Sequence, residues 1–327
     1  MKRNAITLLL ISLALILSLC SCELAYDAPE VGKMNILVYG NDYGGSSSKK
    51  VDVYYENGDK VGTASGLEST LNDAVEVGNV FVSLAINAGM DYQITYLLGS
   101  KTTSNSDAVF PANVVNDVTV SSLKGALESL SSTASANDIT VIYYSGHGTG
   151  STQKVSYGTD TSSDTYLVLK KDSGDDYLAY KIGDFLDLVE AIPGTKVIIG
   201  DFCHSGGLVQ SGYVSMTSNE YSDMSLANLY SCRDKISEYS SLFCLSAARY
   251  YESSYEISSL GHGYFTKALL DALGWDEDSK SLTTAEAEKN DRITLFNVAN
   301  YVIENDNNTK QTPMLSGGSN DVILFSF

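Results

Sequence analysis

Apolar residues along the chain follow two alternating patterns: short continuous runs, and longer segments in which they recur at helical spacing. The continuous runs are rich in β-branched residues, as in strands that a sheet buries on both faces. They predict strands at residues 35–40, 92–98, 139–145, 196–202, 241–247 and 321–327. Helical spacing predicts helices at residues 67–88, 119–130, 182–191, 264–273 and 295–304. Because strands alternate with helices, we expect one α/β domain with a mainly parallel central β-sheet and helices on both faces.

Polar segments rich in Gly, Ser, Thr and Asp separate these elements. Residues 166–169 and 177–180 predict the two strands of a hairpin, and residues 51–55 predict a further small strand or hairpin. Exposed connections are expected at residues 99–116, 148–165, 208–235 and 274–291. The third of these is too long for an ordinary connector, which is typical of functional or disordered loops.

The first residues have the pattern of an export signal. A short basic start at residues 1–4 precedes an apolar run at residues 5–19 that is too short to span a membrane comfortably and ends at cysteines. Ser21 immediately before Cys22 resembles a bacterial lipobox, whereas bulky Leu19 before Cys20 fits cleavage less well. The alternative is an ordinary signal peptide with incidental cysteines.

This pattern sets the predicted organisation and location of the chain. We expect a signal peptide with lipobox at residues 1–21, lipidation of Cys22, a tether at residues 22–34 and one domain at residues 35–327. The protein would then be exported and anchored by lipid to a membrane of a bacterial cell envelope.

Composition narrows the class of protein. Hydrophobic residues make up 43% of the chain, which is enough for a packed core. The formal net charge is −19 and no stripe of Lys or Arg is present, so nucleic-acid binding is excluded as a main function. The predicted mature part keeps Cys203, Cys232 and Cys244, and an odd number of cysteines in an exported protein leaves at least one reactive thiol.

Two of the predicted strands end in residues with catalytic chemistry. Cys203 follows the strand at residues 196–202, and His147 follows the strand at residues 139–145. Ligands and active sites of open α/β folds lie at the carboxyl ends of the strands, where a thiol and an imidazole would form a nucleophile pair. The thiol needs such a partner because its ordinary pKa is about 8.5. The alternative for Cys203 is a buried structural cysteine.

Glycines flank the histidine in Gly146-His147-Gly148 and permit close approach of a substrate to the backbone. The backbone N–H groups of Gly148 and Cys203 would both face the carbonyl under attack, so we predict that they form the oxyanion hole.

Several motifs resemble one known family. Y-S-G-H-G at residues 144–148 and D-F-C-H-S-G at residues 201–206 are similar to the signature of metacaspases and related caspase-like cysteine peptidases. Three further segments match the family: N-D-A at residues 72–74, G-Y-F-T-K-A-L at residues 263–269 and Q-T-P-M-L at residues 311–315. The resemblance thus runs from about residue 35 to the C-terminus. It implies a caspase-like fold with a Cys203/His147 dyad.

The resemblance also implies a substrate. Asp73, Ser145 and Asp201 match positions that line the first specificity pocket of metacaspases, which accepts a basic residue. Two carboxylates in a cleft would pair with a guanidinium or ammonium group. The alternatives are a helix N-terminal carboxylate for Asp73 and a loop-bracing acceptor for Asp201. His204 is expected to be structural, and His262, in a second G-H-G sequence, is assigned no role.

Calcium is the one cofactor to consider, because it activates many metacaspases. Asp164, Asp172, Asp175 and Asp176 lie in the connection after His147 and carry the oxygen ligands that Ca²⁺ prefers. Turn chemistry is the alternative for acids in this pattern. Zinc is excluded because the paired Cys/His spacing is absent, and no cofactor is required by a Cys/His mechanism.

The sequence therefore predicts a cysteine endopeptidase that hydrolyses peptide bonds after Arg or Lys through a thioester. Its partners would be a protein or peptide substrate with a basic residue at the cleavage site and, through the anchor, a membrane. Two alternatives stay open: a non-catalytic surface lipoprotein that uses the fold as a binding module, and a transpeptidase or ligase with the same acyl-enzyme.

Overall fold

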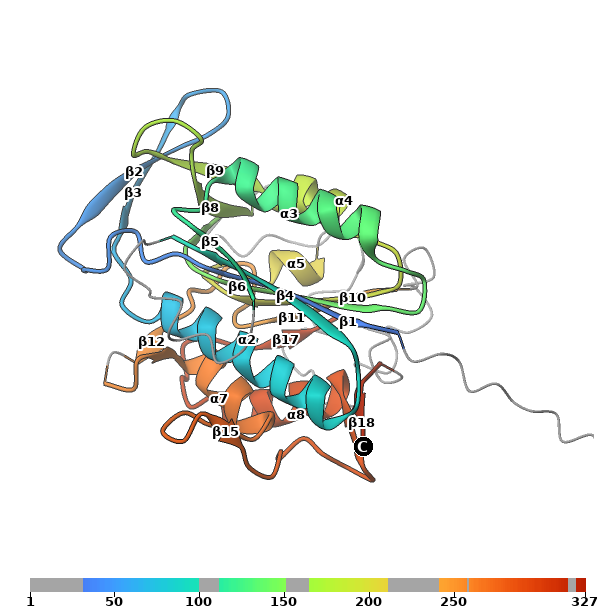
Figure 1. The fold of residues 1–327 in the computed structure, drawn as a ribbon. Coiled ribbons are helices and arrows are strands. Elements are labelled where there is room, and N and C mark those ends of the chain that lie inside the picture. Colours follow the sequence, from blue (N-terminus) through green and yellow to red (C-terminus); the bar gives the residue numbers. More distant parts are fainter. Residues whose placement is uncertain (1–31, 100–111, 151–164, 211–240, 258, 317–321) are drawn as a thin grey trace, which may run out of the picture. The chain divides into compact units, whose positions relative to one another are not determined.

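A seven-stranded sheet forms the centre of the computed structural model (Figure 1). Its strand order is β17-β11-β10-β6-β1-β4-β5, and every neighbouring pair is parallel except β11 with β17. The strands are β1 (Met34–Gly40), β4 (Tyr92–Leu98), β5 (Asn113–Asn116), β6 (Ile139–Ser145), β10 (Thr195–Asp201), β11 (Leu242–Ser246) and β17 (Met314–Leu315). The predicted mainly parallel sheet is thus confirmed. Its two edge strands, β5 and β17, were not predicted because both are too short to carry a periodic pattern.

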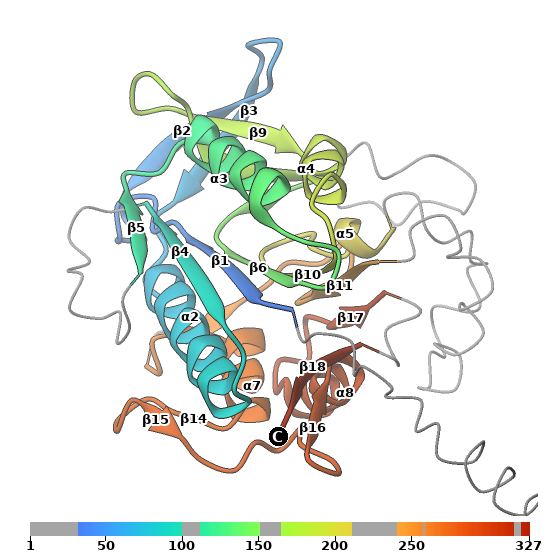
Figure 2. The ribbon, with the colours of Figure 1, turned by 45° about the vertical axis from the view of Figure 1, so that its right-hand side comes forward.

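Helices cover both faces of this sheet, as predicted (Figures 1 and 2). One face carries α2 (Thr70–Asn87), α7 (Tyr264–Ala272) and α8 (Leu295–Asn305), and the other carries α3 (Val120–Thr133), α4 (Ile182–Glu190) and α5 (Gly207–Gln210). Alternate residues of each strand enter opposite cores: Ile36 and Val38 pack with the α2 side, and Leu37 and Tyr39 with the α3 side. Burial on both faces explains why these strands are continuous apolar runs.

A second sheet has the order β3-β2-β9-β8-β7, and its edge strand β7 follows β6 in the chain. It contains β2 (Lys50–Tyr54), β3 (Lys60–Ser65), β7 (Gly148–Thr149), β8 (Tyr166–Lys170) and β9 (Tyr177–Lys181). The expected hairpin of residues 166–180 is therefore present, and the segment at residues 51–55 is the first strand of another. Gly148, expected at the start of a loop, instead pairs with Leu167 of β8.

Three short antiparallel pairs complete the fold: β12 (Glu256–Ile257) with β13 (His262–Gly263), β14 (Trp275–Asp276) with β15 (Ser281–Leu282), and β16 (Arg292–Thr294) with β18 (Ile323–Ser326). The expectation that residues 274–291 are exposed is wrong in part. Trp275 is only 4% exposed, because its indole N–H donates to the buried carboxylate of Glu76 at 2.6 Å. One aromatic side chain thus ties an acidic segment to α2.

The structure describes residues 32–99, 112–150, 165–210, 241–257, 259–316 and 322–327, and from Gly32 on the chain forms one compact unit. The predicted signal, the lipobox with Cys22, nearly all of the tether, Asp164 and Cys232 lie outside these ranges. Within them, the longest apolar helices fall short of what is needed to cross a bilayer.

Candidate active site

His147 and Cys203 come together because β6 and β10 are neighbouring parallel strands. Ser145 at the end of β6 is in register with Asp201 at the end of β10, so the residue two positions further along each strand reaches the same edge of the sheet. Both side chains line one cavity of about 260 Å³. The same cavity is lined by Asp73 of α2, Ser145 and Asp201. The structure therefore brings together all five side chains that the sequence predicts for catalysis and substrate binding.

The imidazole of His147 is held by its Nε2 atom. Nε2 lies 2.6 Å from the main-chain carbonyl of Ser65, and the backbone N–H of His147 donates to the hydroxyl of Tyr43 at 2.8 Å. A carbonyl oxygen only accepts, so Nε2 carries a proton and Nδ1 of the neutral ring is the acceptor. Burial lowers the pKa of His147, against an opposing effect of Ser65. A neutral ring with an acceptor nitrogen is what a general base requires.

The thiol of Cys203 is partly buried, and its Sγ donates to the carbonyl of Ser254 at 3.7 Å. Burial raises the pKa of the thiol, against a smaller opposing effect of the Ser254 backbone. Among the described residues, the hydrogen bonds of Cys203 Sγ and His147 Nε2 thus lead to main-chain carbonyls, not to each other. Because the pKa of Cys203 is raised and that of His147 is lowered, the resting pair is a neutral thiol and a neutral imidazole. The thiol proton must therefore be transferred during the reaction.

The backbones of Gly148 and Cys203 are in close contact. A Cβ atom on Gly148 would lie 2.2 Å from the carbonyl oxygen of Cys203, so only glycine fits there. After Cys203 the chain turns sharply at His204, which adopts a φ of 66°. The His204 ring, 7% exposed, is bonded through Nδ1 to the carbonyl of Tyr250 at 2.7 Å, so His204 braces the turn.

Asp73 lines the cavity and is only 1% exposed. Its Oδ2 atom accepts from the hydroxyl of Ser145 at 2.9 Å, and its Oδ1 atom accepts from the backbone N–H of Gly263 at 3.3 Å. Burial raises the pKa of Asp73, while the hydrogen bonds from His262, Ser145 and Gly263 oppose the rise. Asp73 is therefore more than a helix N-terminal carboxylate, because it joins α2 to β6 and β13.

Asp201, also buried, is the second carboxylate of the cavity. Its Oδ2 atom accepts from the hydroxyl of Thr266 at 2.6 Å, and its Oδ1 atom accepts from the hydroxyl of Ser254 at 2.5 Å. Burial, and secondarily the charge of Asp73, raise the pKa of Asp201 to about 7. Near neutral pH this group therefore exchanges between its neutral and its ionised form.

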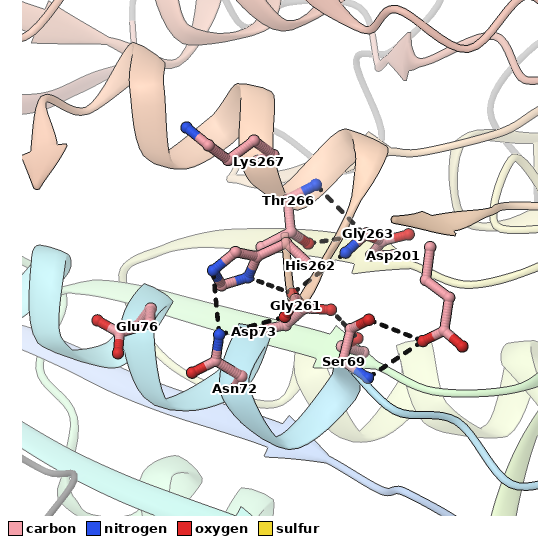
Figure 3. A network of polar contacts seen from close by, with 12 residues as sticks. Ser69, Asn72, Asp73, Glu76, Asp201, Gly261, His262, Gly263, Thr266 and Lys267 are labelled. Atoms are coloured by element: carbon pink, nitrogen blue, oxygen red, sulfur yellow. Dashed lines mark hydrogen bonds and ion pairs between the residues drawn. The ribbon is translucent and has the colours of Figure 1, made fainter. Parts of the chain in front are cut away.

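His262, to which the sequence interpretation assigned no role, lies against the carboxylate of Asp73 (Figure 3). It is 0% exposed, and its ring joins two carboxylates: Nδ1 lies 2.7 Å from Asp73 Oδ1 and Nε2 lies 2.8 Å from Glu277 Oε2. Burial would lower the pKa of His262, but the two carboxylates raise it to about 9. The repeated G-H-G tripeptide was the available sequence signal for His262, whereas its distance from Asp73 in the sequence gives no indication that the two side chains are in contact.

The cavity has a further wall that the sequence did not indicate, formed by Ser254, Tyr255 and Glu256. The Glu256 carboxylate accepts from the backbone N–H and the hydroxyl of Ser69, at 3.1 and 2.8 Å, and so fastens this wall to the start of α2. These residues follow no motif, and only the tertiary fold brings them to the site.

The described acids of the proposed calcium set do not form a metal cluster. Among the residues that the structure describes, groups of three or more His, Cys, Asp or Glu side chains arranged for a metal ion are absent. Asp172 instead accepts from Thr119 and Ser121 at 2.6 and 2.9 Å, at the start of α3. Asp164 lies outside the described residues, so we derive no catalytic step from calcium.

Comparisons with known proteins show which sequences and structures this chain resembles. The sequence model of the family described as "Caspase domain" matches residues 53–322. Metacaspase-4 of Arabidopsis thaliana is 37% identical over 89 residues, which cover 27% of this chain and 20% of the relative. Metacaspase-6 of the same plant is 30% identical over 151 residues, which cover 46% of this chain and 36% of the relative. The chain thus aligns with about a fifth to about a third of these relatives. A crystal structure of a Geobacter sulfurreducens protein, 14% identical, covers 87% of this chain and 94% of its own with a TM-score of 0.48.

Proposed function

Because this chain belongs to the caspase-domain family, whose members include cysteine peptidases, we propose that it is an endopeptidase that cleaves after Arg or Lys. The observation that carries the proposal is the single cavity in which His147 and Cys203 meet the buried carboxylates Asp73 and Asp201. A nucleophile pair beside buried acids is the arrangement that cleavage next to a cationic residue requires.

In the proposed reaction, His147 Nδ1 takes the proton of the Cys203 thiol as Sγ forms a bond to the carbonyl carbon of the substrate. The backbone N–H groups of Gly148 and Cys203 donate to the oxyanion. When the tetrahedral intermediate collapses, the C–N bond breaks and His147 returns the proton to the leaving amine. Water then attacks the thioester, gives its proton to His147, and releases the acid product and the thiol.

Specificity would come from the carboxylates. An Arg or Lys side chain entering beside Asp201 gains a charge-assisted hydrogen bond in a largely buried site, where the interaction is stronger than in water. The same carboxylates would repel an acidic side chain of a substrate.

The test is hydrolysis of fluorogenic peptides that end in Arg, Lys or Asp, with and without Ca²⁺, by the wild-type chain and by Cys203→Ala. We expect cleavage after Arg and Lys that Cys203→Ala abolishes. Cleavage after Asp alone would overturn the assignment of the acidic pocket and leave the nucleophile in place. Activity that survives Cys203→Ala would overturn the mechanism.

The export proposal has its own test. If Cys22 is lipidated, metabolic labelling with a radioactive fatty acid will mark the chain, and Cys22→Ala will remove the label while Cys20→Ala keeps it. Label that is lost only with Cys20→Ala would move the anchor to that cysteine.

A further inference from the structure

A buried chain of charged groups lies directly behind the substrate cavity. Asp73 lines the cavity, His262 lies behind it with 0% exposure, and Glu277 ends the chain nearer the surface with 27% of its side chain exposed. The Asn72 amide also lies within hydrogen-bond distance of His262 Nε2, at 3.1 Å (Figure 3). Both ring nitrogens of His262 therefore face carboxylates, which favours the imidazolium form of the ring.

The position of this histidine gives it influence over the cavity without contact with a substrate. Its neighbour Gly263 lines the cavity, and a Cβ atom there would lie 2.1 Å from Asp201 Oδ2. Gly263 also donates its backbone N–H to Asp73. His262 and Gly263 thus connect the two carboxylates, so a change at His262 reaches the charge of both.

We propose that His262 sets the charge of the specificity pocket: it compensates the charge of Asp73, so that the pocket accepts a cationic side chain only when Asp201 is ionised. This inference rests on the proposed cleavage after Arg or Lys. His262 is a positioning residue in this scheme, because it touches Asp73 and not the substrate.

The charge count follows from the groups that face each site. His262 is faced by Asp73 from α2 and by Glu277 from the β14–β15 turn. Glu277 is in turn faced by two cations, Lys267 at 3.9 Å and Lys280, which help to keep the Glu277 pKa low after the larger effect of His262. Lys267 also pairs with Asp271, and Lys280 with Glu76. Glu277 is partly exposed, so water and the nearby lysines weaken its interaction with His262, whereas buried Asp73 interacts with the imidazolium more strongly.

Asp201 is faced mainly by groups that oppose its ionisation. Burial raises the pKa of Asp201 most, the charge of Asp73 is the next largest effect, and the charge of Asp306 has a smaller effect. The ring of Tyr143 and the thiol of Cys203 also interact with Asp201. The opposing influences are the hydroxyls of Ser254 and Thr266, which donate to the carboxylate. With Asp201 protonated, the buried set of Asp73, His262 and Asp201 is neutral. With Asp201 ionised, it carries one negative charge, which one substrate cation cancels.

Two consequences follow for binding. As the pH falls below about 7, the pocket loses its charge, and the affinity for a cationic peptide falls by up to about tenfold per pH unit. Binding at lower pH also releases a proton from Asp201 to solvent. Without the imidazolium, Asp73 and Asp201 would share one proton and keep one negative charge as the pH falls. Both the loss of affinity at low pH and the release of a proton on binding would then be smaller.

The experiment uses the purified chain with Cys203→Ala, which separates binding from chemistry. The dissociation constant of a tripeptide amide ending in Arg is measured by calorimetry from pH 8 to pH 5.5, with His262 intact and with His262→Asn. Asparagine keeps an N–H donor near the Nδ1 position and removes the charge, together with the Nε2 contacts to Glu277 and Asn72. Buffers of different ionisation enthalpy report the protons released. Lys289→Gln, an exposed lysine that does not line the cavity, is the control for a change in net charge.

With His262 intact, we expect the dissociation constant to rise about 30-fold over this range, with close to one proton released at pH 5.5. With His262→Asn, the rise is less than about threefold and fewer protons are released. Equal pH dependence and equal proton release in both backgrounds overturn the inference. If His262→Asn does not fold, His262→Gln replaces it, because glutamine also removes the charge, keeps an N–H donor near the Nε2 position and should flatten the profile in the same way.

Failure of the two proposals is distinguishable. Absence of both binding and wild-type hydrolysis for Arg and Lys peptides contradicts the proposed function, and the inference falls with it. Hydrolysis after Arg with a pH profile that ignores His262 contradicts the inference alone. A fall in wild-type kcat on His262→Asn, with unchanged pH dependence of KM, would assign His262 a purely structural role and also overturn the inference.

Discussion

The chain contains the sequence Gly-His-Gly twice, and the two histidines have opposite properties. His147 has a main-chain carbonyl as the partner of its Nε2 atom, and burial lowers its pKa. His262 has a carboxylate at each ring nitrogen, and these raise its pKa to about 9. At neutral pH the first is a base and the second a cation. The partners that the fold supplies, and not the local sequence, decide which chemistry an imidazole performs.

The glycines after these histidines differ in the same way. Gly148 leaves room for the carbonyl of Cys203, which is backbone, whereas Gly263 leaves room for the side chain of Asp201. The first sequence therefore lies against the proposed nucleophile and the second against a carboxylate of the proposed specificity pocket. Four predictions use this contrast, in order of expected effect.

The largest effect is expected from removing the base. His147→Asn should lower kcat for an Arg peptide by about 10⁴-fold, because the thiol then has no acceptor for its proton. Steady-state kinetics at pH 8 measure it. His204→Asn, a histidine next to the nucleophile with a structural partner, is the matched comparison. A loss no larger than that of His204→Asn would show that His147 is not the base.

The second effect concerns stability and is specific to His262. Its folded pKa of about 9 exceeds the usual unfolded value of about 6.5, so its contribution is fully present below pH 6.5 and is lost as the pH rises through 9. The difference in the free energy of unfolding between wild type and His262→Asn should shrink by about 3 kcal/mol between pH 6.5 and 9.5. Urea denaturation at several pH values measures it. A difference that is constant with pH would contradict the imidazolium assignment.

The third prediction separates the two glycines. Gly148→Ala displaces the Cys203 backbone and should lower kcat about 100-fold, as loss of an oxyanion donor does. Gly263→Ala displaces the Asp201 carboxylate and should raise KM for an Arg peptide about tenfold with a smaller effect on kcat. The same profile for both variants would show that these two places are not functionally distinct.

The smallest effect is expected at Tyr43, which supports only the first of the two histidines. Its hydroxyl donates to the carbonyl of Val168 at 2.8 Å and accepts from the backbone N–H of His147. Tyr43→Phe should lower kcat about fivefold, since a lost hydrogen bond contributes about 1 kcal/mol. KM for an Arg peptide should stay within twofold of wild type. A change confined to KM would place Tyr43 in the pocket instead.

Much of the fold was predictable because the buried strands are long apolar runs. The strands β1, β6 and β10 fill both cores, and their carboxyl ends put His147 and Cys203 together. The shortest strands were not predictable, since β12, β13 and β17 have two residues each and their pairing depends on tertiary contacts.

The same limit applies within the site. The dyad and Asp73, Ser145 and Asp201 follow from motifs, because their residue types match a local chemistry. The role of His262 depends on Asp73, 189 positions earlier in the chain, and on Glu277 in a segment that was expected to be an exposed loop. A tripeptide alone does not reveal partners at such a distance, and the burial that contributes to each pKa shift is a property of the folded chain.

The most direct test is a titration of the histidine ring protons by NMR in an untagged chain. The sequence has 3 histidines, so single substitutions to Asn assign each resonance. The account predicts one ring, His262, that titrates with a pKa near 9, and two, His147 and His204, that titrate below their ordinary value. A His262 pKa at or below about 6.5, or a His147 pKa above it, would contradict the division of the two Gly-His-Gly sequences into base and counter-ion.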